Sequence, residues 1–374
     1  MNSAARDDRL TVLLSLGSSM PVRICSVAVV LVLAAGLAAD DDEEKFAIPP
    51  RTVTLDMPNS TLGKVGPAVA RAGFPFAFPQ AAAGQTCDGV FNGKPFWFAL
   101  EMIASQTGNR VAISDNGRKI ALEPRGKSYE VSSVHGAFRV AVRQVVGRFQ
   151  LDSGTTSHDV QMDVHWEPRF PVFRLDSSPK ITKAADDKGT ALAAQAADSR
   201  SQPTGYLHPA TVRLTGLTRE SKRIAALEGS FTVTASEKML VFEFGDLTKG
   251  KTAVALPDKD KVAASLKNVE KDEKTWIFEI ELSYPANIPK FESFESWTHE
   301  NRLRLIAPNK KSFSPDDAEV LTQGSKITGI YRFKEDAKSG LVNPASKDWK
   351  LVYEAPSPPV EFTVPFELKD IPLP

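Results

Sequence analysis

Cysteine is scarce in this chain of 374 residues, which has only Cys25 and Cys87. Cys25 lies in an N-terminal segment that we expect to be removed, which would leave Cys87 without a disulfide partner. A single cysteine also cannot form a cysteine-based metal cluster. A nucleophilic cysteine needs a neighbouring base, and the surrounding residues 84–89 contain no histidine. We therefore interpret Cys87 as an ordinary thiol in a loop.

A surplus of charge of either sign is also lacking. Lysine plus arginine and aspartate plus glutamate number 46 each, and the sequence pI is about 7.0. A general nucleic-acid binder needs a basic surplus, so we expect no nucleic-acid partner. The hydrophobic content of 42% is enough for packed cores, which excludes a disordered chain.

Motifs of the common enzyme classes are missing. The sequence has no G-x-S-x-G, no P-loop, no G-x-G-x-x-G and no H-E-x-x-H. Five histidines are scattered along the chain, which leaves a catalytic triad open but does not indicate one. We assign no catalytic, cofactor-binding or metal-binding residue and expect no cofactor.

The N-terminus carries one short apolar segment. Residues 24–39 are uncharged and largely apolar, Arg23 precedes them, and the acidic residues 40–44 follow. The segment is short for a membrane-spanning helix, which needs about 20 residues. It is typical of a signal peptide covering residues 1–39, so we expect an exported protein of the periplasm or cell envelope.

Two points about this segment stay open. Gly36 and Ala38 offer the small residues that a signal peptidase needs, and a true start at Met20 would give a more ordinary signal sequence. The alternative is an uncleaved anchor, which would be the protein's only attachment to a membrane. Residues 40–51 then form an acidic linker.

Residues 52–124 show strand and helix periodicities in a regular order. Asn59 and Ser60 are candidate caps for a helix that begins near Leu62, and Gly73 is suited to end it with a positive φ. Asn-Gly at 116–117 predicts a hairpin. The predicted elements are strands at 52–57, 74–78, 89–92, 110–114 and 119–123, with helices after Ser60 and Pro95 that end at Gly73 and Gly108. This β-α-β-β-α-β-β order suits one small α+β layer.

The residues at 58–62, 99–101 and 107–108 resemble the short N-terminal domain shared by secretins and TonB-dependent receptors. They read Pro-Asn-Ser-Thr-Leu, Ala-Leu-Glu and Thr-Gly, and the similar region is roughly a fifth of the chain. Pro67 departs from the pattern and should kink or delay the first helix. The resemblance implies a domain that contacts other envelope proteins or stacks in rings and has no active site. The alternative is a small α+β domain of unrelated ancestry.

The rest of the chain alternates apolar and polar residues in segments separated by proline, glycine and asparagine. The clearest strands are at 138–142, 160–166, 240–244, 276–282 and 360–368. They predict one or two antiparallel β-sandwich domains of immunoglobulin-like type, at 128–249 and 275–374. Residues 250–274 would be a linker or a first strand, and residues 183–205 a long, flexible surface loop. Pro365 indicates that the last strand lies at a sheet edge. The chain is thus expected to combine the α+β and all-β classes.

The best metal candidates are His158, Asp163, His165 and Glu167. On a strand, the last three would share one face at spacings of about 6–7 Å and could offer oxygen and nitrogen ligands. His158 would lie on the opposite face of the strand. The same face would be the solvent-exposed side of an amphipathic strand, and we favour that interpretation.

Two further groups of carboxylates are interpreted as structural. Asp186 and Asp187 lack the alternating oxygens and the closing glutamate of a calcium loop, so a turn is expected. The second group surrounds Trp297 and could indicate sugar binding or glycoside cleavage, although exposed charges beside a core tryptophan explain it better. Its members are Glu292, Glu295, His299 and Glu300.

We therefore expect an exported, non-enzymatic envelope protein that binds another envelope protein through its small domain or through strand edges. One alternative is a carbohydrate-binding protein in which Trp276, Trp297 or Trp349 stacks on sugar rings. A second alternative is a metal-dependent hydrolase built on His165 and Glu167. The sequence indicates no particular partner, ligand or oligomeric state.

Overall fold

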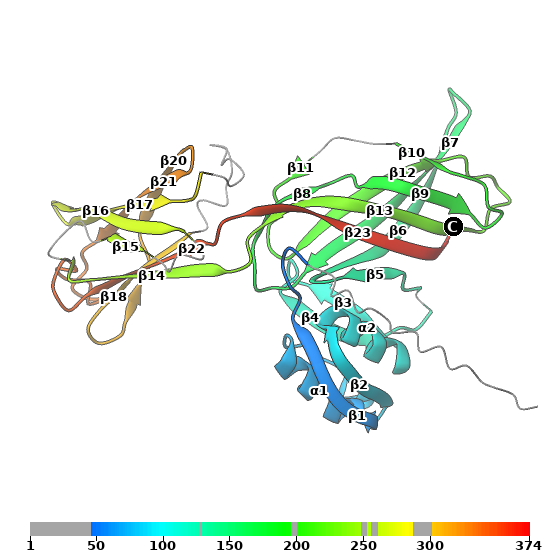
Figure 1. Ribbon diagram of the computed structural model, residues 1–374, viewed down its shortest axis with the longest axis horizontal. Helices are drawn as coiled ribbons and strands as arrows, with labels where there is room; N and C mark the ends of the chain where they lie inside the picture. Colours follow the sequence, from blue (N-terminus) through cyan, green and yellow to red (C-terminus); the bar gives the residue numbers. More distant parts are fainter. Residues whose placement is uncertain (1–45, 128, 196–199, 248–252, 256–260, 287–300) are drawn as a thin grey trace, which may run out of the picture. The chain divides into compact units, whose positions relative to one another are not determined.

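The computed structural model describes residues 46–127, 129–195, 200–247, 253–255, 261–286 and 301–374 (Figure 1). The expected signal peptide and residues 40–45 of the acidic linker lie outside the described residues, as do Trp297 and the carboxylates around it. The described chain is mostly β, with both of its α-helices near the N-terminal end.

The small domain begins at Thr52 and ends at Pro124. Its elements are β1 (Thr52–Thr61), α1 (Leu62–Ala72), a 3₁₀ turn (Gln80–Ala82), β2 (Thr86–Pro95), α2 (Phe96–Gln106), β3 (Asn109–Ser114) and β4 (Lys119–Pro124). β1 pairs with β2 and β3 pairs with β4, both antiparallel. The apolar faces of the two helices pack into one cluster with these strands. The predicted helices and hairpin are confirmed.

Three local predictions for this domain were wrong. Residues 74–78 form only an isolated parallel bridge, between Ala77 and Ala121. The cap of α1 is Thr61, which makes no side-chain cap hydrogen bond, because β1 continues past Asn59 to the start of the helix. Gly73 ends α1 with a φ of −113°, and its need for glycine is steric. A Cβ there would lie 2.1 Å from the Phe96 ring.

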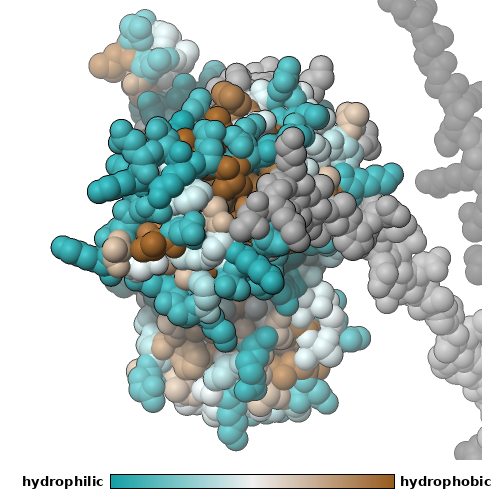
Figure 2. All heavy atoms as spheres, turned by 90° about the vertical axis from the view of Figure 1, so that its left-hand side faces the viewer, coloured by the Kyte–Doolittle hydropathy of each residue, from teal (hydrophilic) through white to brown (hydrophobic). Residues whose placement is uncertain are grey.

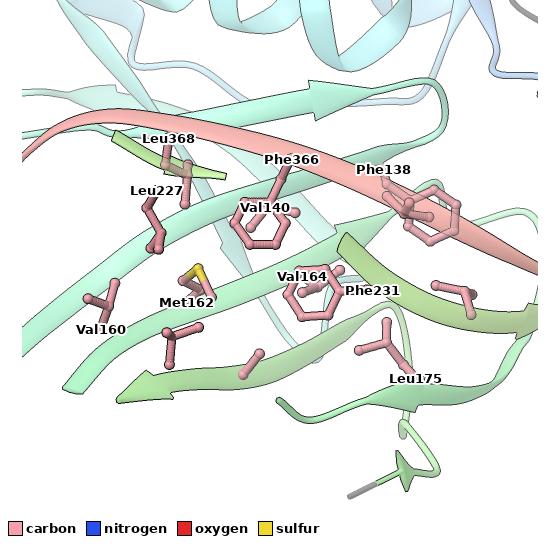
Figure 3. Packing of buried hydrophobic residues seen from close by; sticks show 14 of the residues in the cluster. Phe138, Val140, Val160, Met162, Val164, Leu175, Leu227, Phe231, Phe366 and Leu368 are labelled. Carbon is pink, nitrogen blue, oxygen red and sulfur yellow. The ribbon is translucent and has the colours of Figure 1, made fainter. Parts of the chain in front are cut away.

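Two five-stranded sheets follow and share one hydrophobic core. The first has the order β10-β12-β7-β6-β5, and the second has β11-β8-β13-β23 with β9 also on β13. The bounds are β5 (Ser132–His135), β6 (Phe138–Gln150), β7 (Thr155–Trp166), β8 (Val172–Asp176), β9 (Lys180–Asp186), β10 (Ala193–Gln195), β11 (Arg200–Ser201), β12 (Leu207–Thr215), β13 (Arg223–Ala235) and β23 (Val360–Pro372). Figure 3 shows side chains of both sheets meeting in this core, including Met162 and Val164 from β7 and Phe366 from β23.

A second pair of sheets is built from the residues between β13 and β23. One has the order β14-β22-β18-β19 and the other β15-β16-β17-β21-β20, and a separate hydrophobic cluster joins them. The bounds are β14 (Met239–Gly245), β15 (Ala253–Ala255), β16 (Ala263–Asp272), β17 (Thr275–Ser283), β18 (Arg302–Ile306), β19 (Ser312–Phe313), β20 (Asp317–Gln323), β21 (Lys326–Lys334) and β22 (Lys350–Pro356).

The strand pairing corrects the expected boundaries. β23 returns to the first pair of sheets, where it lies along β13 from Val360 opposite Ala235 to Pro372 opposite Arg223 (Figure 1). β14 belongs to the second pair, through β22. The blocks 128–249 and 275–374 therefore do not correspond to the two pairs of sheets. β23 is the outermost strand of its sheet, which confirms the edge position expected from Pro365.

The segment expected to be a long loop, residues 183–205, contains structure. β9 extends into it as far as Asp186, and β10 and β11 follow, with residues 196–199 outside the described part. Pairing with β13, β12 and β8 explains these strands, because short segments without periodicity gain their order from neighbouring strands.

Candidate functional site

The strand β7 carries Asp163 and His165 on one face, as their spacing predicts. Their expected exposure was wrong, because His165 is only 4% exposed and the side chain of Asp163 only 19%. Glu167, just after β7, is fully buried. The cause is tertiary packing, because the small domain lies against β6 and β7. Trp97 of α2 donates a hydrogen bond to the Ala137 carbonyl at 3.1 Å, and Glu101 of α2 forms an ion pair with Arg139.

Arg139 is the centre of this buried polar region. It lies opposite His165 on β6, is 2% exposed, and is held between the carboxylates of Glu101 and Glu130 at 2.5 and 2.9 Å. Glu130 also accepts the Val111 N–H at 2.9 Å. A buried charge is tolerated only when it is paired in this way, so this arrangement fastens α2 and β3 to β6.

Burial sets the protonation of the groups around Arg139. It raises the pKa of Glu130 and the pKa of Asp163, because a charged carboxylate loses its water. It also lowers the pKa of His165 well below the ordinary value, and the positive charge of Arg139 acts in the same direction. His165 is therefore a neutral side chain, and its Nδ1 has no hydrogen-bond partner among the described residues.

Glu167 has a separate structural role. Its carboxylate accepts Arg169 Nε at 2.6 Å and the Arg51 N–H at 2.8 Å, so it ties the chain before β1 to the end of β7. His165 and Glu167 are both buried, and the hydrogen bonds of Glu167 go to Arg169 and to the Arg51 N–H. The arrangement does not support the hydrolase alternative.

The metal interpretation gains no support from the geometry. His158 pairs with Gly147 of β6. It is an odd number of residues from Asp163 along β7, so it lies on the opposite face of the strand, as expected. Within the ranges that the structure describes, no three histidine, cysteine, aspartate or glutamate side chains are grouped so that they could hold a metal ion. Asp186 accepts the N–H groups of Lys188 and Thr190 and the Ser221 hydroxyl, which is the expected turn.

Cys87 and the tryptophans occupy structural positions. Cys87 is 3% exposed and lies in β2 rather than in a loop, and burial raises the pKa of its thiol. Trp349 is 6% exposed and packs against Phe313, so it has no free face for a sugar ring. Trp276 donates its indole N–H to Glu335 at 2.8 Å. The ammonium of Lys271 also lies 5.2 Å from the centre of the Trp276 ring. The two candidate tryptophans in the described part of the chain therefore do not favour the carbohydrate alternative.

The small domain has an exposed apolar surface that the sequence analysis missed. Phe98 and Met102 lie one turn apart on α2 and are 40% and 39% exposed, and Val90 of β2 is 52% exposed. The ammonium of Lys94 lies 5.9 Å from the Phe98 ring, and the Asp88 N–H donates to Gln106 at 2.7 Å. These two contacts place α2 along β2. Val90 is exposed between two buried residues of β2, so its side chain lies on the face of β2 opposite the buried one. We call Val90, Phe98 and Met102 the α2–β2 surface.

The same contacts identify a free strand edge. Among the described residues, the sheet order gives β2 only β1 as a neighbour. The Asp88 N–H points away from β1, toward Gln106. Since alternate residues of an antiparallel strand direct their backbone groups to the same side, those of Val90 also point to this edge. The edge and the apolar side chains therefore lie together.

A signal for this surface was present in the sequence. Phe98, Met102 and Gln106 recur every four residues on the side of α2 away from Leu100 and Ile103, and Lys94 precedes them at the same spacing in β2. Exposed apolar residues also occur elsewhere, for example Val241 at 51%. Figure 2 shows another face of the molecule, on the side of β16 and β18, where hydrophobic side chains gather within a mainly hydrophilic surface. Exposure alone thus does not single out the α2–β2 surface, whereas its position beside a free edge does.

Comparison with known proteins adds no assignment. No protein-family model, no curated protein and no solved structure matches the chain. The resemblance to the secretin and TonB-receptor domain stays a prediction from the residues at 58–62, 99–101 and 107–108. Neither helix in the described part of the chain has the length and apolarity needed to cross a membrane.

Proposed function

We propose that this chain is an exported, non-enzymatic protein of the periplasm or cell envelope that binds another envelope protein. The small domain would be of the secretin/TonB-receptor type, and the sheets after it would be immunoglobulin-like sandwiches. The observation that carries the proposal is the free edge of β2 beside the α2–β2 surface.

The mode of binding that suits this surface is strand addition. An extended segment of the partner would hydrogen-bond to the outward backbone groups of β2, and its alternate side chains would pack on Phe98 and Met102. Backbone pairing supplies affinity with little sequence preference, and the apolar contacts supply selectivity. Lys94 and Asp88, at the two ends of the surface, would add charge selectivity at its rim.

The test is crosslinking of the tagged protein in intact cells, followed by recovery from separated compartments. We expect one stoichiometric envelope partner, and we expect Val90→Lys and Met102→Lys to reduce its recovery at least tenfold, because each places a charge in an apolar contact. Val241→Lys is the matched control, since Val241 is equally exposed on β14, another strand at the end of its sheet order. Undiminished recovery with Val90→Lys, or sustained hydrolase turnover by the purified protein, would contradict the proposal.

A further inference from the structure

A pocket of about 410 Å³ lies where the start of β8, the segment before β12 and the strands β18 and β22 meet. Its volume is in the range of small-molecule sites, roughly 300–1,000 Å³. None of the residues of the α2–β2 surface lines it, and it plays no part in the proposed protein contact. Its lining contains three arginines and one carboxylate, Glu354.

Two of the arginines are available to a ligand. Arg118 and Arg302 are exposed, and among the described residues neither side chain has an ion-pair or hydrogen-bond partner. The third, Arg169, is bonded to Glu167 and lies 5.2 Å from the Phe170 ring. Glu354 is already paired with Arg304. The pocket thus presents uncompensated positive charge.

The walls of the pocket are fixed by backbone hydrogen bonds. The Tyr206 N–H donates to the Asn116 carbonyl at 2.7 Å, which holds the β3–β4 turn and its Arg118 against the segment before β12. The Ser236 N–H donates to the Pro171 carbonyl at 3.1 Å, which holds the start of β8. Because its walls are tied in this way, the pocket is largely formed before a ligand binds, which lowers the entropic cost of binding.

The remaining lining is suited to an organic ligand. Tyr206 is half-buried and offers aromatic surface. Asn301 is 6% exposed, donates its amide to the Tyr353 hydroxyl at 2.8 Å, and has an Oδ1 with no partner in the described structure. An unpaired buried acceptor gains free energy from a ligand hydroxyl or N–H. The lining therefore combines anion recognition with an acceptor and apolar contacts.

We propose that this pocket binds a small organic anion, a hydroxylated molecule carrying a phosphate or a carboxylate, through Arg118 and Arg302. The planar guanidinium donates two parallel hydrogen bonds to either group, which is why both belong to the ligand class. The ring and hydroxyl groups of the ligand face Tyr206 and Asn301.

The test is isothermal titration of the purified protein with glucose 6-phosphate, glucuronate and neutral glucose. We expect one of the two anions, or both, to bind in a salt-sensitive manner, and glucose to bind at least tenfold more weakly. Phosphate and carboxylate ligands are distinguished by which probe binds more tightly. Failure of both anions to bind would overturn the proposal.

Variants locate the binding within the chain. Arg118→Gln and Arg302→Gln should each weaken binding at least tenfold, because each removes charge-assisted hydrogen bonds to the anion. The matched control is Arg71→Gln with Arg219→Gln, which removes two exposed arginines remote from the pocket lining. Equal affinity of the pocket variants and the control would overturn the proposal. Arg118 and Arg302 have no partners to lose, so the unfolding midpoint should be unchanged.

Discussion

At the scale of single residues, the most informative side chain is His165. It is 4% exposed beside Arg139, and the charged groups facing it are Arg139 and Arg143 from β6, Asp163 from its own strand, Glu101 from α2 and Glu130 from the segment before β5. Its lowered pKa means that the folded protein keeps it neutral while the unfolded chain protonates it below its ordinary pKa of 6.5. The contribution of His165 to stability is therefore present above pH 6.5 and is lost as the pH falls below it.

We predict that His165→Gln reduces the pH dependence of stability. Below pH 6.5, protonation of His165 in the unfolded state lowers the free energy of unfolding of the wild-type protein, and the variant does not have this loss. The free energy of unfolding should be measured by urea denaturation at pH 7.5 and pH 5.5. The raised pKa values of Glu130 and Asp163 act in the opposite sense in both proteins, so the difference between the two slopes isolates the histidine. Parallel slopes would refute the prediction.

At the scale of elements, the β3–β4 turn does more than connect two strands. Asn116 and Gly117 have positive φ, as the Asn-Gly hairpin predicts, and the turn also accepts a backbone hydrogen bond from Tyr206. Gly205 has a φ of +96°, and a Cβ there would lie 2.4 Å from the Asn116 carbonyl oxygen. Glycine is needed at 205 for its conformation and for the close approach of two backbones.

We predict that Gly205→Ala destabilises the protein by more than the ~1 kcal/mol typical of a positive φ alone. Gly154→Ala is the matched control, because Gly154 has a φ of +66° with nothing within 4 Å of a Cβ, so it shows the conformational cost without the collision. Thermal unfolding of the two variants separates the cost of the positive φ from the cost of the collision with Asn116. Equal losses of stability would mean that the turn does not press on Gly205.

At the scale of the whole described chain, the two pairs of sheets have separate hydrophobic clusters, and the last strand completes the earlier pair. Val364, Phe366, Leu368 and Ile371 of β23 are all buried in the first cluster. Phe366 packs on Phe231 of β13 with ring centroids 5.2 Å apart. The first pair of sheets is therefore incomplete until the C-terminus of the chain is present.

We predict that Phe366→Ala costs about 3–5 kcal/mol, the usual range for deleting a buried phenylalanine. Hydrogen exchange should speed up in β13 and β9 in this variant, although both strands lie more than a hundred residues earlier in the sequence. Phe278→Ala is the comparison, because Phe278 packs on Phe333 in the second cluster. It should speed up exchange in β17 and β21 and leave β13 protected. The same exchange pattern in both variants would contradict the separation of the two clusters.

The sequence by itself determined the local structure wherever periodicity or turn chemistry was strong. The helices, the Asn-Gly hairpin and the placement of Asp163 and His165 on one face of β7 follow from local spacing and turn chemistry. So do the strands β1–β4, β6, β7, β14, β17 and β23. The edge position of β23 follows from Pro365, which cannot donate to a sheet ladder. The absence of enzyme motifs limited the function classes but left the partner open.

Only the tertiary structure decided what covers each surface. The alternation in β7 is the same whether its polar face meets water or another domain, so packing of α2 on these strands could not be read from it. Strand order depends on contacts across more than a hundred residues, and no local pattern marks β23 as the partner of β13. The pocket likewise exists because side chains distant in sequence come together. Periodicity determines which face of an element is apolar, whereas the pairing of faces is determined by the packing of the whole chain.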